Sequence, residues 1–95
     1  TQRDVALVSP KSVSADDLRT FIEKNACGEM DPEVVDEVTI FDVYSGENLG
    51  HDQVSLGFSI FYQSRGRTLR DEEVGRAFED LIKKLEKEFP VEIRG

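Results

Sequence analysis

The sequence of 95 residues predicts one α+β domain whose elements follow the order β-α-β-β-α-β. Three observations carry this prediction. Residues 54–63 alternate between apolar and small polar side chains, which is the period of a strand. Residues 71–88 place apolar side chains along one helical stripe. Shorter segments on either side predict a second helix and three more strands, so the domain is a four-stranded antiparallel sheet with two helices on one face.

The N-terminal part predicts a strand followed by a helix. Val5–Val8 is an apolar run that is closed by Ser9 and Pro10, as expected of a strand that ends where a proline stops donating. Ser14, with Asp17 three residues later, is typical of a helix N-terminus. The apolar spacing after it predicts a helix over 14–26, with Gly28 as its stop.

The middle of the chain predicts a connector and a β-hairpin. Pro32 biases Asp31 away from helix, so the acidic stretch around it is expected to connect two elements. Residues 38–44 are rich in β-branched and aromatic side chains and predict a strand, but apolar residues occupy both phases and leave its buried face undecided. Turn residues fill 45–52. In the next strand we expect Val54, Leu56, Phe58, Ile60 and Tyr62 to face the core, and Ser55, Gly57, Ser59, Phe61 and Gln63 to face outward.

The C-terminal part predicts a long helix over 71–88 and a short last strand over 91–93, separated by Pro90. The resulting element order is the ferredoxin-like split βαβ arrangement. Ninety-five residues suffice for a single core, so we expect one domain over 1–95. The chain starts at Thr1 and its only methionine is Met30, from which we expect a fragment of a longer protein.

The charge distribution is more informative than the net charge of −8. Residues 25–53 hold eight acidic residues and no Lys or Arg, whereas residues 54–70 hold Arg65, Arg67 and Arg70 and no acid. The overall acidity argues against nonspecific binding of nucleic acid. A local cluster of three arginines can still bind phosphate within a screening length of about 8 to 10 Å.

The sequence provides little support for a catalytic or metal-binding site. Cys27 is the only cysteine, which excludes an internal disulfide and a Cys-rich zinc site and agrees with a reducing, cytoplasmic location. His51 lies among turn residues and is expected to be a surface side chain. The acidic residues lack the spacing of a calcium loop, and no glycine-rich phosphate loop is present. We therefore expect no catalytic residue, metal or cofactor in this domain, and a small enzyme on this fold is the weakest class.

The outward face of the sheet is the best candidate for binding. Single-stranded RNA modules of related topology stack bases on aromatic side chains of such a face. Phe61 would offer the aromatic surface, and Ser55, Ser59 and Gln63 would offer hydrogen bonds. The alternative is that this face packs on a neighbouring domain, as in a protein-interaction or regulatory module without RNA contact.

The three arginines flank the start of the second helix, whose free backbone N–H groups also favour phosphate. Arg65, Arg67 and Arg70 are therefore candidate phosphate ligands. Their alternative role is to form ion pairs with the acidic stretch or with residues 71–73.

The sequence resembles the ferredoxin-fold anticodon-binding domain at the C-terminus of phenylalanyl-tRNA synthetase beta subunits. The segments that carry the resemblance span nearly the whole chain: 41–46 (FDVYSG), Ser55-Leu56, Gln63-Ser64, Arg67-Thr68-Leu69, 71–74 (DEEV), 85–88 (LEKE) and Ile93-Arg94-Gly95. The resemblance implies a domain that holds the anticodon stem-loop of phenylalanine tRNA. The synthetase alpha subunit would charge the acceptor end with ATP and magnesium, within a heterotetramer that also contains the other beta-chain domains.

The chain departs from this family at three positions. Family members often carry lysines just before the residue that matches Ser55, where this chain has Asp52-Gln53-Val54, and a basic residue where Ser59 stands. A small hydroxyl residue suits the position of Arg70 as a helix cap. With Arg70 there, we expect Thr68 or Asp71 to cap the second helix.

Overall fold

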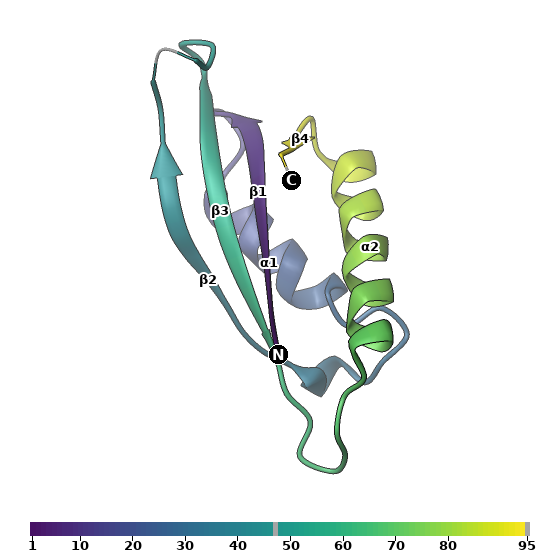
Figure 1. The fold of residues 1–95 in the computed structure, drawn as a ribbon. Coiled ribbons are helices and arrows are strands. Elements are labelled where there is room, and N and C mark those ends of the chain that lie inside the picture. The colour runs from purple at the N-terminus through teal and green to yellow at the C-terminus, as the bar shows by residue number, and fades with distance from the viewer. Residues whose placement is uncertain (47, 95) are drawn as a thin grey trace.

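The structure of the protein, a computed structural model, describes residues 1–46 and 48–94. Glu47, which belongs to the predicted hairpin turn and acidic stretch, and Gly95, which closes the last family motif, lie outside the described residues. The elements are β1 (Gln2–Pro10), α1 (Ala15–Asn25), a short 3-10 helix η1 (Pro32–Val34), β2 (Val35–Tyr44), β3 (Gln53–Tyr62), α2 (Asp71–Glu88) and β4 (Glu92–Ile93). The strands form one antiparallel sheet in the order β2-β3-β1-β4, which confirms the predicted ferredoxin-like α+β class (Figure 1).

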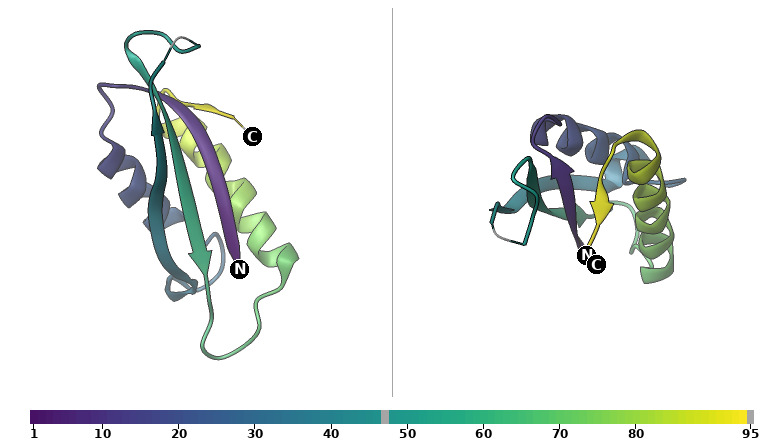
Figure 2. Two further views of the ribbon diagram at one scale, coloured as in Figure 1. Left: turned by 60° about the vertical axis from the view of Figure 1, so that its left-hand side comes forward. Right: turned by 90° about the horizontal axis from the view of Figure 1, so that it is seen from above.

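Both helices cover the same face of the sheet, as the two views of Figure 2 show. The alternation in β3 explains this arrangement, because Leu56, Phe58 and Ile60 all point into one core that both helices share. The core also contains Val5 and Leu7 of β1, Leu18 and Ile22 of α1, and Val74, Leu81 and Leu85 of α2. The opposite face of the sheet, here called the open face, carries no helix of the described residues. In the part of the chain that the structure describes, neither helix is long and apolar enough to cross a membrane.

The ends of α1 follow the predicted signals. Ser14 is the N-cap, and its Oγ accepts the Asp17 N–H at 3.2 Å. After α1 the chain turns at Gly28, whose φ of 58° favours glycine. A Cβ at this position would also lie 2.9 Å from the Cβ of Ala77 in α2. The connection between α1 and β2 therefore passes against α2 without room for a side chain.

The cap of α2 differs from the prediction. The sequence predicts Thr68 or Asp71 as the cap, but Arg70 occupies the N-cap position, so this prediction is wrong. The physical reason is that the cap bond comes from the other half of a capping box: the Glu73 carboxylate accepts the Arg70 N–H at 3.0 Å. A guanidinium has no acceptor, so Arg70 contributes backbone conformation only.

Two register shifts in β2 explain its mixed pattern of apolar residues. The pairing with β3 shifts between Val35 and Glu37 and again between Ile40 and Asp42. Each shift leaves one extra residue on β2, Asp36 and Phe41, which is the geometry of a β-bulge. Because a bulge changes the phase of alternation, no single face could be read from the sequence of this strand.

Candidate nucleic-acid interface

The strand register defines four rows of side chains across the open face, taken from β2 through β3 to β1. They are Glu37–Phe61–Gln2, Thr39–Ser59–Asp4, Asp42–Gly57–Ala6 and Tyr44–Ser55–Val8. Ser55, Ser59 and Phe61 therefore lie on the open face, as predicted. The rows also contain residues of β2 that the sequence did not allow us to place.

A glycine in the third row shapes this face. The ring of the bulge residue Phe41 lies against Gly57, because a Cβ at position 57 would be 2.7 Å from Phe41 Cζ. The Phe41 side chain is nevertheless 56% exposed, so one side of its ring is free. Asp42 follows in the same row, and Tyr44, 48% exposed, lies opposite Ser55 in the next. This end of the open face thus combines two exposed aromatic rings, a carboxylate and a hydroxyl.

Ser59 differs from the other outward residues because its hydroxyl already has partners. Its Oγ donates to Asp4 Oδ1 at 2.8 Å and accepts from Gln2 Nε2 at 3.4 Å. Only 5% of Ser59 is exposed. Hydrogen bonds from the Gln2 side chain and from Ser59 lower the pKa of Asp4 below its ordinary value, so this carboxylate stays charged. A ligand that uses Ser59 must first displace Asp4.

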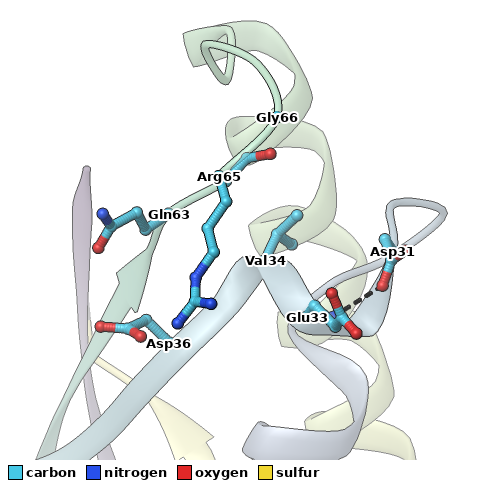
Figure 3. Close-up of a pocket in the computed structure, with 8 residues that line it drawn as sticks. Asp31, Glu33, Val34, Asp36, Gln63, Arg65 and Gly66 are labelled. Atoms are coloured by element: carbon cyan, nitrogen blue, oxygen red, sulfur yellow. Dashed lines mark hydrogen bonds between the residues drawn. The ribbon is translucent and has the colours of Figure 1, made fainter.

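Gln63 and Arg65 lie at the opposite end of β3, in a shallow pocket beside η1 (Figure 3). Asp31, Glu33 and Asp36 also line this pocket, and the Arg65 side chain points toward Asp36. The distance between the two groups is outside ion-pair range, since no ion pair of Arg65 occurs within residues 1–46 and 48–94. One guanidinium among three carboxylates gives this pocket a net negative charge.

Arg67 forms an ion pair with α2. Its Nη1 and Nη2 donate to the two Glu73 carboxylate oxygens at 2.8 and 2.9 Å. The hydrogen bonds from Arg67 and then from the Arg70 backbone lower the pKa of Glu73 to about 2. Arg67 thus takes the ion-pairing role that the sequence left open as an alternative, although half of its side chain remains exposed.

The structure therefore divides the predicted site into two regions. Ser55 and Gln63 are eight residues apart on an extended chain, which corresponds to roughly 26 Å. Gln63 and Arg65 share the pocket at one end, while Ser55 lies near Tyr44 and Asp42 at the other. One nucleotide cannot contact both regions, whereas a folded RNA loop with its stem can.

Sequence reasoning missed four candidate residues on the open face. Phe41, Asp42 and Tyr44 belong to the segment FDVYSG that the resemblance singled out, but the bulge concealed their orientation. The fourth is Arg94, whose N–H donates to the Ala6 carbonyl at 2.7 Å. This bond continues the pairing of Leu7 with Ile93, so Arg94 lies opposite Ala6 in the third row.

The remaining candidate side chains have structural surroundings. Cys27 is buried, and its Sγ donates to the Gly28 carbonyl at 3.7 Å. His51 is exposed in the hairpin turn. No group of three or more His, Cys, Asp or Glu residues that could hold a metal ion occurs in the described part of the chain.

Comparisons with known proteins identify a family for this chain. The sequence model of the ferredoxin-fold anticodon-binding domain matches residues 1–94. The chain is similar to phenylalanine–tRNA ligase beta subunits, with 39% identity to that of Bacillus subtilis, 36% to that of Corynebacterium glutamicum and 40% to that of Geobacillus kaustophilus. Each match covers 98% of this chain but only 10 or 11% of the relative. The chain thus spans about a tenth of the length of these relatives.

Proposed function

Because the chain belongs to the ferredoxin-fold anticodon-binding domain family, we propose that it binds the anticodon stem-loop of phenylalanine tRNA as one module of a phenylalanine–tRNA ligase beta subunit. Its role is to hold and orient the tRNA. The alpha subunit of the parent heterotetramer carries out aminoacylation with ATP and magnesium. The observation that supports this proposal best is the group of Phe41, Asp42, Tyr44 and Ser55 on the open face.

This group has the chemistry to bind unpaired bases. The exposed rings of Phe41 and Tyr44 offer stacking surfaces. An ionised carboxylate only accepts hydrogen bonds, so Asp42 binds base edges that present N–H donors, and guanine can offer it two at once from its N1–H and amino group. The Ser55 hydroxyl can donate or accept. Asp42 also repels phosphate, and therefore favours an RNA segment that presents its bases to the sheet and its backbone to solvent.

Phosphate contacts are assigned to the cations around this face. Arg65 and Arg70 form no ion pair in the part of the chain that the structure describes, and both lie in the connection before α2. Arg67 contributes only if it leaves Glu73, and Ser59 only if it leaves Asp4. Phe61 and Gln63 are the remaining candidate residues for contact with the RNA.

Fluorescence anisotropy with a labelled anticodon stem-loop of phenylalanine tRNA tests the proposal. We expect saturable binding at low salt, and we expect Tyr44→Ala to weaken it about tenfold or more, since stacking on one aromatic side chain contributes about 1–3 kcal/mol per base. The matched control is Val43→Ala, because the neighbouring residue lies on the other face of β2. Absence of binding at low salt, or equal affinity for Tyr44→Ala and the unaltered chain, would refute it.

A second candidate is a protein-interaction module without RNA contact. Asp4, Glu37, Asp42 and Glu92 all lie on the open face, while Arg94 is the one Lys or Arg placed there by the register of the described residues. Such a face fits a basic protein surface. The same titration separates the two functions, because the second predicts no affinity for the stem-loop.

A further inference from the structure

The outer half of β2 leaves apolar side chains uncovered on the side of the sheet that the helices cover. Ile40 and Val43 lie opposite Phe58 and Leu56, which are both core residues, so all four point to the helix side. Phe58 and Leu56 are buried, yet Ile40 is 36% exposed and Val43 is 64% exposed. The reason is that β2 is an edge strand of the sheet, and its C-terminal end extends beyond the helices (Figure 1).

A groove between α1 and β2 leads to these residues. It is lined by Arg19, Glu23, Val35, Asp36, Glu37 and Val38, and is here called the α1–β2 groove. Val35 contributes its accessible apolar part, since Val38 is buried in the core, and Ile40 and Val43 follow the lining residues along β2. Among the described residues, Arg19 is the one cation in the lining, and it already forms ion pairs with Asp16 and Glu23.

The charges around the groove are unbalanced. Asp36 and Glu37 are exposed, and neither forms an ion pair within the described part of the chain. Residues 25–53 contain no Lys or Arg, and Arg65, whose side chain points toward Asp36 from outside this stretch, forms no ion pair with it. An apolar strip bordered by unpaired carboxylates is complementary to an apolar strip bordered by cations.

These charges also decide among possible occupants. RNA would bring phosphates against Asp36 and Glu37, and a second copy of the chain, with its own net charge of −8, would bring the same carboxylates. The two bulges in β2 further disfavour edge-to-edge pairing with another strand. An amphipathic helix meets none of these obstacles, because it needs no backbone bonds from the edge.

We propose that the α1–β2 groove, together with Ile40 and Val43, docks an amphipathic protein helix whose apolar stripe is flanked by Lys or Arg. The relatives are about nine times longer than the matched segment, so a parent chain of that length is long enough to supply such a helix. The apolar residues Ile40 and Val43 point to the opposite side of β2 from Tyr44, whereas Glu37, which lies in the first row of the open face, also lines the groove. The apolar contact is therefore separate from the proposed RNA contact and compatible with it.

Three synthetic helical peptides of equal length test this proposal by NMR titration of the isotope-labelled 95-residue chain. The first carries a leucine stripe flanked by lysines, the second the same stripe flanked by glutamates, and the third the lysines with serine in place of leucine. We expect the first to bind with amide shifts centred on residues 35–43. The second and third should bind at least about tenfold more weakly, because each lacks one half of the complementarity.

Two neighbouring substitutions assign the face. Val43→Ser should weaken binding of the leucine-lysine peptide about tenfold, as expected for loss of a buried valine side chain, and should leave stem-loop binding unchanged. Tyr44→Ser, the matched control, should leave peptide binding unchanged. Both side chains are exposed in the free domain, so both variants should fold, which circular dichroism verifies.

Four results would overturn the proposal. Equal binding of the serine-lysine peptide would show charge attraction alone, and shifts centred outside the groove would place the site elsewhere. Stem-loop RNA that shifts Ile40 and Val43 in the same way would make RNA the occupant. A dimer in sedimentation that Val43→Ser dissociates would make it a second copy.

Discussion

Single atoms decide which parts of the open face a ligand can reach. The missing side chain of Gly57 lets the Phe41 ring lie against the strand, which leaves one ring surface exposed. Two rows away from Tyr44, the Ser59 hydroxyl already donates a hydrogen bond to the Asp4 carboxylate. The accessible chemistry is therefore concentrated around Phe41, Asp42 and Tyr44, and not along the whole length of β3.

At the same scale, Tyr62 ties the sheet to the end of α1. Its hydroxyl donates to the buried Ala26 carbonyl at 2.9 Å. Tyr62→Phe leaves this carbonyl without its partner and should lower the free energy of unfolding at pH 7 by about 1 kcal/mol. Urea denaturation followed by circular dichroism measures the change; Tyr44→Phe, which alters an exposed ring, serves as the control and should differ little.

The pH dependence of this effect has a definite sign. Burial raises the pKa of Tyr62 to about 12 from its ordinary value of 10.0. A raised pKa means that the stabilisation is complete below pH 10 and is lost as pH rises through 12. Tyr62→Phe has no such loss, so the stabilities of the two proteins should converge near pH 11, where the loss reaches about 1.4 kcal/mol. If the free energies of unfolding of the two proteins change in parallel between pH 9 and 11.5, the raised pKa of Tyr62 is contradicted.

At the scale of the element, Glu73 joins the arginine-bearing connection to α2. One carboxylate accepts from the Arg70 N–H and from both terminal nitrogens of Arg67. The cap of the helix and the position of Arg67 therefore depend on the same group. This coupling explains why α2 begins at Asp71 although its N-cap residue has no side-chain acceptor.

Acid titration of thermal stability tests this coupling. The pKa of Glu73 is lowered to about 2, mainly by the hydrogen bond from Arg67. A lowered pKa means that its stabilisation is complete above pH 4.5 and is lost as pH falls through 2. Glu73→Gln should therefore lower the Tm at pH 7 and show a smaller further decrease between pH 4.5 and 2. Glu72→Gln, a neutralisation in the same helical turn, should keep the wild-type acid profile, and identical profiles for both variants would argue against the coupling.

Two glycines around α2 provide a second test at this scale. Gly28→Ala should destabilise the protein by about 1–3 kcal/mol, because the left-handed φ and the 2.9 Å approach to Ala77 both oppose a Cβ. Gly75→Ala within α2 meets no atom within 4 Å and should stabilise the protein by about 0.5–1 kcal/mol through helix propensity. Chemical denaturation of both variants gives the two signs. Equal effects would mean that the turn at Gly28 is not constrained as described.

At the scale of the whole molecule, the sequence predicted most of what depends on local pattern. The alternation of β3 and the apolar stripe of α2 gave strand and helix bounds within a residue of those observed. The bulge at Phe41 was beyond reach, because its phase change depends on pairing with another strand. The hydrogen bond from Ser59 to Asp4 joins residues 55 positions apart, so no local sequence pattern predicts it. The division of the site into two regions follows from the length of β3, which separates Ser55 from Gln63.

The salt dependence of RNA binding reveals how many of the arginines contact phosphate. Each phosphate contact with a single-stranded segment contributes about −0.7 to the slope of log affinity against log salt. Three contacts from Arg65, Arg67 and Arg70 would give a slope of about −2, whereas Arg67 held by Glu73 leaves two and a slope of about −1.4. We expect the smaller value, since RNA must break the bidentate ion pair to gain the third contact.

Single substitutions in the same titration identify the contributing cations. Arg65→Ala should reduce the magnitude of the slope by about 0.7, and Arg67→Ala should leave it unchanged although the thermal stability falls with the loss of the Glu73 pair. Glu73→Gln releases Arg67 without removing it and should restore a slope of about −2. If Arg67→Ala reduces the magnitude of the slope as much as Arg65→Ala does, RNA displaces Glu73 from Arg67. The ion pair of the free domain is then exchanged for a phosphate contact on binding.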